Sequence, residues 1–257
     1  MNPKASRMQP PAYRAGMTRA TRALILAARL AVPGILLPGT AAAQVAPTPV
    51  QVRDWSPWFG AAHRGDIGAL QAALDKGADI DQRDAYGRTA LHVATFARRH
   101  EVIGYLLRRK ADPALLEADR YDAVTIAAVA DDEPGLRTLL AGGASAGLTT
   151  SRYDGTALIA AAHLGHDGVV RQLIAAGAPL DHVNNLHWTA AIEAIVLGDG
   201  GPRHQASLRA LIDAGANLAL TDSAGNTPLD LARQRGYQPM VEMIARATGE
   251  IRQNFSK

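Results

Sequence analysis

Few side chains in this 257-residue sequence stand at spacings that could carry chemistry. His163 and His166 are three residues apart and would face one metal ion if both lay on a single helix. The run Asp131-Asp132-Glu133 gathers three carboxylates, but no partner acid or base stands at a useful spacing from it, so we expect a solvated turn. The sequence has no cysteine and no glycine-rich phosphate-binding loop. It therefore predicts no thiol nucleophile, no thiolate metal site, no cofactor and no enzyme.

Two short patterns recur along the chain and indicate how it is built. A Gly-Ala pair, replaced once by Lys110-Ala111, returns at intervals of 33, 33, 34 and 38 residues. A triplet similar to Thr-Ala-Leu keeps nearly the same interval. The pairs begin at Gly77, Lys110, Gly143, Gly177 and Gly215, and the triplets begin at Thr89, Val124, Thr156, Thr189 and Thr227. Repetition at this period indicates a solenoid of stacked units, which offers a surface for another macromolecule rather than a buried pocket.

The repeated units resemble ankyrin repeats, whose pattern opens with Asp-x-x-Gly-x-Thr-Pro-Leu-His-x-Ala. The segments that begin at Asp84 and Asp222 match this pattern best. The resemblance covers residues 52–249 in about six units and implies an all-α repeat solenoid of helix-loop-helix repeats joined by short finger turns. It also implies that His92 bonds to neighbouring backbone, and that Gly165-His166 forms a structural turn between two helices rather than a metal site.

Two of the units depart from the family pattern. In the third unit, Asp122 and Val124 replace the usual Gly and Thr. The fifth unit carries an insertion of about five residues within Gly198–Gln205, between its two helices. Glycine and proline in the insertion favour a flexible loop, which is either a tolerated surface insertion or a functional element.

Residues 1–43 are a different kind of sequence and predict a cleaved secretory signal. They hold six basic residues and no acidic one. An apolar run from Ala23 to Leu37, interrupted by Arg29, precedes Ala41-Ala42-Ala43. This layout indicates cleavage after Ala43, with Met17 as an alternative start, and delivery to the periplasm of a bacterium. An uncleaved membrane anchor is the rival interpretation. The run is short for a spanning helix, however, and contains Pro33 and Gly34.

The remaining chain divides into a linker, the repeats and a tail. We expect a linker over residues 44–51, the repeat domain over 52–249 and a C-terminal tail over 250–257. Pro47 and Pro49 favour an extended tether over residues 44–54. Without the first 43 residues, 21 basic residues stand against 24 acidic ones. Because a nucleic-acid-binding protein should keep a basic body, DNA and RNA are not expected partners.

The resemblance also implies where a partner protein would bind. In ankyrin-like proteins the turns between repeats form fingers and the first helices form a palm. Tyrosine and arginine are common at binding hot spots, so the finger positions suggest a row that docks a protein. The alternative is that each tyrosine packs on the next finger. The finger residues are Tyr86, Tyr121, Tyr153 and Leu186 at one equivalent position, with Arg88, Arg120, Arg152 and Trp188 beside them; the palm adds Phe96, His163, Val196 and Leu197.

These observations predict an exported, monomeric, non-catalytic module that docks a periplasmic protein on its concave finger and palm face. It would act as a scaffold, a helper or an inhibitor of the immunity type, and would not contact membrane after cleavage of the leader. A secreted effector that binds host-cell proteins is the alternative. An enzyme of unknown substrate is the third hypothesis, and no residue supports it.

Overall fold

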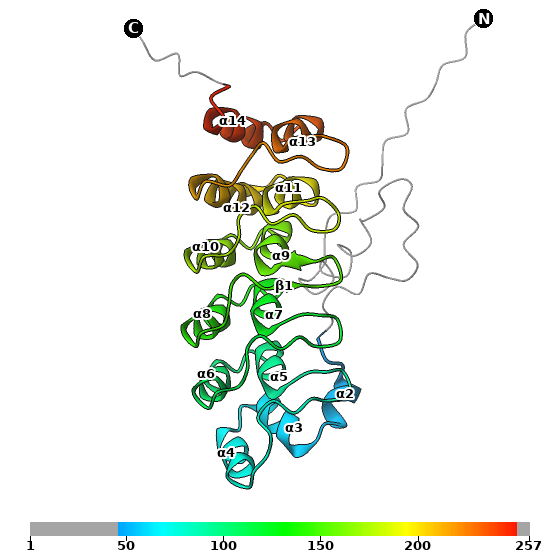
Figure 1. The fold of residues 1–257 in the computed structure, drawn as a ribbon, viewed down its shortest axis with the longest axis vertical. Coiled ribbons are helices and arrows are strands. Elements are labelled where there is room, and N and C mark those ends of the chain that lie inside the picture. Colours follow the sequence, from blue (N-terminus) through cyan, green and yellow to red (C-terminus); the bar gives the residue numbers. More distant parts are fainter. Residues whose placement is uncertain (1–45, 251–257) are drawn as a thin grey trace, which may run out of the picture. The chain divides into compact units, whose positions relative to one another are not determined.

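The computed structural model describes residues 46–250, where helices pair into a regular stack (Figure 1). Six helix pairs follow one another, and each first helix lies in one layer while each second helix lies in the other. The loops that join successive pairs project beyond the first helices, on the side away from the second helices (Figure 1). The predicted all-α repeat solenoid of six units is therefore confirmed.

The pairs are α3 (Pro57–Arg64) with α4 (Ile67–Asp75), α5 (Ala90–Phe96) with α6 (His100–Arg108), α7 (Ala123–Val129) with α8 (Glu133–Ala141), α9 (Ala157–Leu164) with α10 (Asp167–Ala175), α11 (Ala190–Val196) with α12 (Pro202–Asp213), and α13 (Pro228–Arg235) with α14 (Gln238–Ala247). A short helix, α2 (Pro49–Arg53), precedes the first pair. One loop contains a two-stranded antiparallel ladder, β1 (Thr149–Thr150) with β2 (Gly155–Thr156), in which Thr149 pairs with Thr156.

The first helices begin at side chains that cap them. An oxygen of the capping residue accepts a hydrogen bond from the backbone N–H three residues later, which satisfies an otherwise free donor. The caps with this bond are Thr89, Asp122, Thr156, Thr189 and Thr227. Asp122 performs the same task in the third unit that threonine performs in the second, fourth, fifth and sixth, accepting from Thr125 N at 2.8 Å. The unusual sequence of this unit therefore does not disturb its helix.

A continuous apolar core runs through the stack between the two layers. The second helices contribute large side chains such as Leu106, Leu139 and Leu173, all fully buried. The first helices contribute alanines that are buried five residues after the cap, including Ala94 and Ala127. Small residues there let neighbouring first helices pack closely, which explains how a chain with 5% aromatic residues fills its core.

The turns between paired helices are joined to the preceding repeat by side chains. In each case a donor near the start of a second helix reaches a backbone carbonyl at the end of the preceding first helix, so these bonds tie neighbouring units together. The bonds are Arg99 Nε to His63 O (2.8 Å), His166 Nδ1 to Ala128 O (2.9 Å), His204 Nε2 to His163 O (2.9 Å) and Tyr237 Oη to Gly198 O (3.0 Å).

The insertion in the fifth unit is partly helical, which corrects the expectation of a loop over residues 198–205. Pro202 stands in the first turn of α12, where its fixed φ suits a helix, so residues 202–205 extend this helix to twelve residues. Arg203 then reaches back over two repeats: its guanidinium bonds to Asp131 at 2.9 and 3.1 Å, and its Nε bonds to Asp167 at 3.2 Å. The insertion thus fastens the third, fourth and fifth units together.

The extended tether predicted for residues 44–54 is also wrong over part of its length. Pro49 occupies the first turn of α2, and Thr48 and Gln51 form a reciprocal capping box. Proline suits an extended chain but is equally favourable in the first turn of a helix, which explains the difference. The predicted signal and its cleavage site at Ala43 lie outside the described residues.

Candidate protein-binding face

The three finger tyrosines do not occupy equivalent positions when their repeats are aligned on the helix caps. Tyr86 and Tyr153 each lie three residues before a cap, whereas Tyr121 lies one residue before Asp122. Hydrogen bonds agree: Arg88 N donates to Asp84 Oδ1 at 2.9 Å, and Tyr121 N donates to Glu117 Oε1 at 3.1 Å, each reaching back four residues. Tyr121 is thus equivalent to Arg88. The single row of tyrosines expected from the sequence is wrong.

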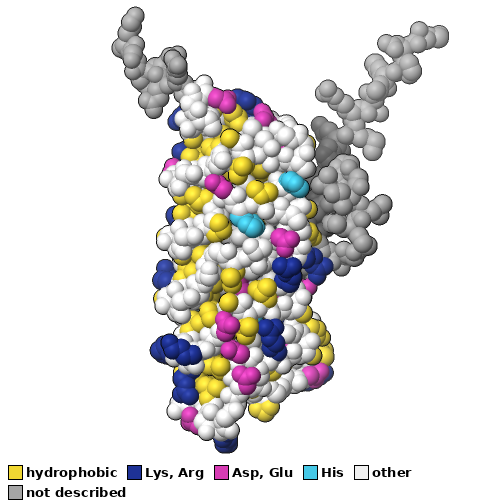
Figure 2. Space-filling view, in the orientation of Figure 1, with side chains coloured by type: hydrophobic (Ala, Val, Ile, Leu, Met, Phe, Trp, Pro, Cys, Tyr) yellow, Lys and Arg dark blue, Asp and Glu magenta, His cyan; other side chains and the backbone are white. Residues whose placement is uncertain are grey.

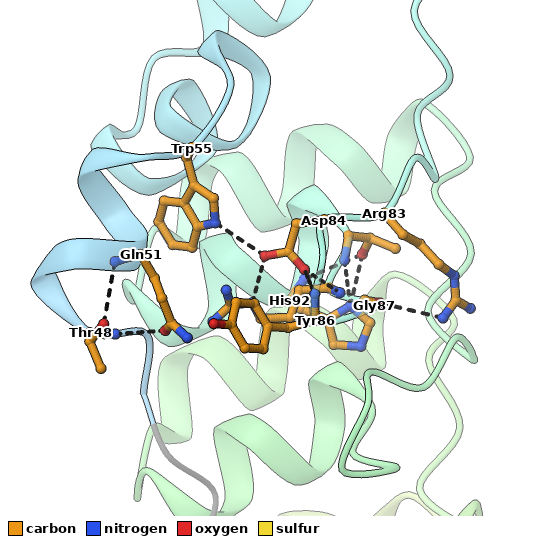
Figure 3. Close-up of polar contacts among 10 residues, drawn as sticks. Thr48, Gln51, Trp55, Arg83, Asp84, Tyr86, Gly87 and His92 are labelled. Carbon is orange, nitrogen blue, oxygen red and sulfur yellow. Dashed lines mark hydrogen bonds and ion pairs between the residues drawn. The ribbon is translucent and has the colours of Figure 1, made fainter.

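Arg88 is buried, so the expectation that it faces a partner is also wrong. Only 4% of the residue is exposed, and its Nε bonds to Asp84 Oδ2 at 2.7 Å. The guanidinium carbon lies 4.6 Å from the ring centre of Tyr86 and 5.3 Å from that of Trp55. Trp55 Nε1 donates to the same carboxylate at 3.1 Å (Figure 3). This cation is enclosed by aromatic rings and a carboxylate of its own chain.

The carboxylate of Asp84 remains ionised in this cluster. Burial by itself raises the pKa of Asp84, but hydrogen bonds from Arg88, the Tyr86 backbone N–H and Trp55 outweigh it and lower the pKa below its usual value. The fingertip is therefore held by a charged pair rather than by neutral groups. Tyr86 covers the pair from outside and is 47% exposed, which leaves it accessible to a partner.

The other two predicted arginines link neighbouring fingers. Arg152 Nη2 lies 2.7 Å from Asp119 Oδ1, and Arg120 Nη2 lies 3.3 Å from Asp154 Oδ1. About half of each arginine side chain is exposed. Tyr153 lies half-buried beside them. These two arginines therefore link neighbouring fingers while about half of each side chain stays exposed.

The palm is a second row, formed by side chains seven residues after each cap. Phe96, His163 and Val196 occupy this register as expected and are half-buried. Val129 occupies it in the third repeat and was missed, although its position follows from the cap at Asp122. The residues immediately before the caps border the palm, and three of them are half-buried aromatics: Trp55, Tyr121 and Trp188. Leu186 and Leu197, also expected here, are half-buried as well.

A charged residue that the sequence analysis did not single out lies on the palm. Glu193 stands four residues after its cap, where the second and third repeats have the fully buried Val93 and Ile126. Its Oε2 lies 3.2 Å from His163 Nδ1 and its Oε1 accepts from Asn184 Nδ2 at 2.9 Å. The signal for it was present in the sequence: a glutamate in a register that is otherwise apolar.

The two histidines that stand three residues apart, and Asp132 of the acidic run, contact other groups of the fold. His166 bonds to a backbone carbonyl while His163 contacts Glu193, so the two do not face one ion. Within residues 46–250, no group of three or more histidine, aspartate or glutamate side chains is placed to hold a metal. Asp132 is buried rather than solvated: it caps α8 and accepts from His100 Nε2 at 2.9 Å. The expectation of a solvated turn is therefore wrong at Asp132.

His92 bonds to backbone as the resemblance implied. Its Nδ1 accepts from Thr89 N at 3.1 Å, and its Nε2 lies 3.2 Å from Tyr121 O in the next repeat. Burial is the main reason that the pKa of His92 falls to about 4. The neutral ring therefore joins the second and third fingers from within.

The surface drawn in Figure 2 mixes both signs of charge with scattered apolar side chains. No broad field of one charge covers this face, in contrast to a typical nucleic-acid-binding surface. In the part of the chain that the structure describes, no helix is both long enough and apolar enough to cross a bilayer.

Comparisons with known proteins identify relatives of this stack. Models of ankyrin repeats match residues 59–107 (many copies) and residues 124–222 (3 copies). The ankyrin repeat protein YahD of Escherichia coli (strain K12) is 33% identical over 188 residues, which cover 73% of this chain and 93% of that protein.

Solved structures share the fold. An ankyrin repeat domain from Acinetobacter baumannii AYE is 41% identical with a TM-score of 0.71, covering 75% of this chain and 97% of that chain. A chain of the complex between a predatory endopeptidase of Bdellovibrio bacteriovorus and the immunity protein Bd3460 is 22% identical with a TM-score of 0.59, over 75% and 98%.

Proposed function

Because this chain belongs to the ankyrin-repeat family, we propose that it is an exported, monomeric, non-catalytic module that docks another protein on its fingers and palm. Ankyrin repeats are in general modules for protein–protein interaction rather than enzymes. The proposal depends most on one observation: half-buried aromatic and aliphatic side chains recur at two fixed registers, one residue before a cap and seven residues after it. Trp55, Phe96, Tyr121, Trp188 and Val196 occupy these registers.

The chemistry of these side chains suits protein recognition. Tryptophan and tyrosine offer large contact areas with few rotatable bonds, and they are the residue types that most often dominate binding energy. Around them lie side chains that can donate hydrogen bonds from a fixed position. Arg120 and Arg152 are such groups, because each pairs with a carboxylate of a neighbouring finger and about half of its side chain is exposed.

Export is the second part of the proposal. Residues 1–43 have the basic start, apolar run and small residues of a secretory signal, and cleavage after Ala43 would release a chain that begins at Gln44. The periplasm is the destination we propose. N-terminal sequencing of protein from a periplasmic extract tests this directly, and a full-length species confined to the cytosol would contradict it.

We propose that the chain acts in the periplasm by binding rather than by catalysis. Such a binder would serve its partner as a scaffold, a helper or an inhibitor. An inhibitor of a toxin, as in immunity proteins, is the sharpest version. The fold also occurs in the solved complex that contains an immunity protein, but at 22% identity that likeness concerns the fold alone.

Capture of the tagged protein from periplasm, followed by mass spectrometry, tests the docking face. The test compares the natural chain with a palm variant, Phe96→Ala with Trp188→Ala. The matched control changes two exposed arginines of the second-helix layer, Arg108→Ala with Arg137→Ala. We expect the palm variant to lose a captured protein that the control retains. Circular dichroism and melting must show that both variants fold, and equal capture by both would contradict the proposal.

A further inference from the structure

A groove lies between α6 and α8, which are neighbours in the second-helix layer (Figure 1). Its volume is about 490 Å³. Two of the side chains that line it are cations, Arg108 from α6 and Arg137 from α8, and none is an acid. The rest of the lining is uncharged, and Leu107 and Ala141 make part of it apolar. The groove therefore combines two positive charges with an apolar floor.

A glycine of α6 lets the guanidinium of Arg108 lie in this groove. A Cβ placed on Gly104 would meet Arg108 Nη1 at 3.2 Å and Thr138 Cγ2 of α8 at 3.5 Å. The guanidinium therefore lies over the glycine, in the space where a side chain of α6 would otherwise face α8. The aspartate four residues after Arg108 is not its partner, because Asp112 Oδ1 accepts from Ala114 N at 2.8 Å.

The second arginine lacks a carboxylate that its counterpart in the next repeat has. Arg137 and Arg171 each stand two residues before a buried leucine of a second helix. Arg171 pairs at 2.8 Å with Asp167, four residues before it. The residue four before Arg137 is Glu133, but its Oε2 accepts from Gln172 Nε2 of the fourth repeat at 3.0 Å. The contact between repeats thus leaves Arg137 without this partner.

Both guanidiniums of the groove are free of carboxylates. Within residues 46–250, the ion pairs of arginine involve other arginines and neither Arg108 nor Arg137. A helix dipole favours a cation in the last turn, which accounts for Arg108 but not for Arg137 in the middle of α8. Arg109 and Lys110, exposed beside Arg108, add to the positive charge. Such a cluster of like charges attracts an anion.

We propose that the groove between α6 and α8 binds a phosphate group. One guanidinium fork is enough to fill a carboxylate, whereas a phosphate has enough oxygens to accept from two guanidiniums at once. The floor at Leu107 and Ala141 suits the carbon atoms of a phosphate ester. The ester comes either from a free small molecule or from a lipid headgroup, and the two sources are separated by the test below.

This site goes beyond the proposed function and does not rest on it. The groove belongs to the second-helix layer, whereas the palm is built on the first helices. Arg108→Ala with Arg137→Ala therefore remains a control for protein docking on the palm, although it removes the phosphate site.

Titration of the purified protein, followed by NMR, tests a free phosphate. The probes are inorganic phosphate and glycerol 3-phosphate, and acetate is the carboxylate control, all at one ionic strength. We expect at least one phosphate probe to move the side-chain Nε–H signals of Arg108 and Arg137 saturably, and acetate to move them much less.

Binding to vesicles tests a lipid headgroup. Vesicles of equal parts phosphatidylcholine and phosphatidylglycerol are compared with vesicles of phosphatidylcholine alone. Every protein compared keeps residues 1–43, whose basic side chains also attract anionic lipid, so the difference between variants is the result. Dependence on the groove arginines in either experiment supports the site and identifies the source of the phosphate.

Three variants make the outcome decisive. Arg108→Ala with Arg137→Ala removes both guanidiniums and should weaken binding about tenfold or more. Arg209→Ala with Arg246→Ala removes the same charge from second helices in which each arginine already pairs with an acid, and should bind like the natural chain. Gly104→Glu supplies a carboxylate within the groove and should also abolish binding. It should fold, because glutamate favours a helix more than glycine does.

Four results would overturn the inference. They are the absence of binding to any phosphate source, equal binding of acetate, an equal loss in both arginine variants, and unchanged binding by folded Gly104→Glu. Circular dichroism and melting check each fold, and the two arginine variants decide the question if Gly104→Glu does not fold. Capture of a partner by the palm is measured with Phe96→Ala and Trp188→Ala, so the two proposals fail separately.

Discussion

The buried ring of His92 should make the stability of this protein depend on pH. In the folded chain the neutral ring accepts from Thr89 N and bonds to Tyr121 O, and burial lowers its pKa from 6.5 to about 4. The unfolded chain binds a proton at this residue near pH 6.5, whereas the folded chain does not until near pH 4. The free energy of unfolding must therefore fall as the pH drops through this window.

The size of the effect follows from the two pKa values. For a single group with these values, the free energy of unfolding at pH 5 is about 2 kcal/mol lower than at pH 7. Nearly all of this loss would occur below pH 6.5, where the unfolded chain begins to bind the proton. The pKa of the unfolded chain limits the loss from this group between pH 7 and pH 5 to about 2 kcal/mol, so a measured loss of about 1.5 to 2 kcal/mol agrees with the calculation.

Urea unfolding at pH 7 and pH 5 measures the effect, and His92→Gln isolates it from other groups. Glutamine keeps the capping box with Thr89 and does not titrate. The variant should be less stable than the natural chain at pH 7, because it loses the contact with Tyr121. The gap between the two proteins should narrow by about 2 kcal/mol at pH 5. If both proteins lose the same stability between pH 7 and pH 5, the reasoning on His92 is refuted.

Three further predictions concern the joints of the stack. Asp132→Ala should cost about 2 kcal/mol in urea unfolding, because it removes a buried cap and the partner of His100, whereas Asp66→Ala at an exposed cap should cost about 1. Arg203→Ala should cost about 1 kcal/mol by the same assay, and Arg209→Ala, which loses one exposed ion pair at 4.0 Å, should cost less than about 0.5. Truncation after Thr221 removes the sixth helix pair and exposes the core beside it, so light scattering should detect aggregation; a monomeric product with unchanged melting would contradict this.

Local patterns carried the fold prediction. A threonine cap recurs in four of the six units and a paired apolar stripe recurs in the second helices, and both act within a few residues of the chain. They were therefore enough to predict six helix pairs without any knowledge of the contacts between them. The register of the palm follows from the same caps, which is why Phe96, His163 and Val196 fall where expected.

Contacts between repeats explain why two predictions from the sequence were wrong. Arg88 was expected to be exposed, but Trp55, 33 residues earlier, covers it. Arg203 was expected in a flexible loop, but it pairs with Asp131, 72 residues away. A pattern with a period of one repeat does not report such pairs. The error at Tyr121 has a different cause. Matching it to Tyr86 and Tyr153 by residue type gives the wrong register, because the helix cap is Asp122 and Tyr121 lies one residue before it.

Site-specific photo-crosslinking tests the central claim most directly. The crosslinking residue p-benzoylphenylalanine replaces Phe96 on the palm in one version of the protein and Arg137 in the second-helix layer in another. Each version is exported in cells, irradiated, and examined for covalent partners by mass spectrometry. The account predicts a crosslinked protein from position 96 and none of that identity from position 137. Crosslinking of a partner from position 137 alone would contradict it.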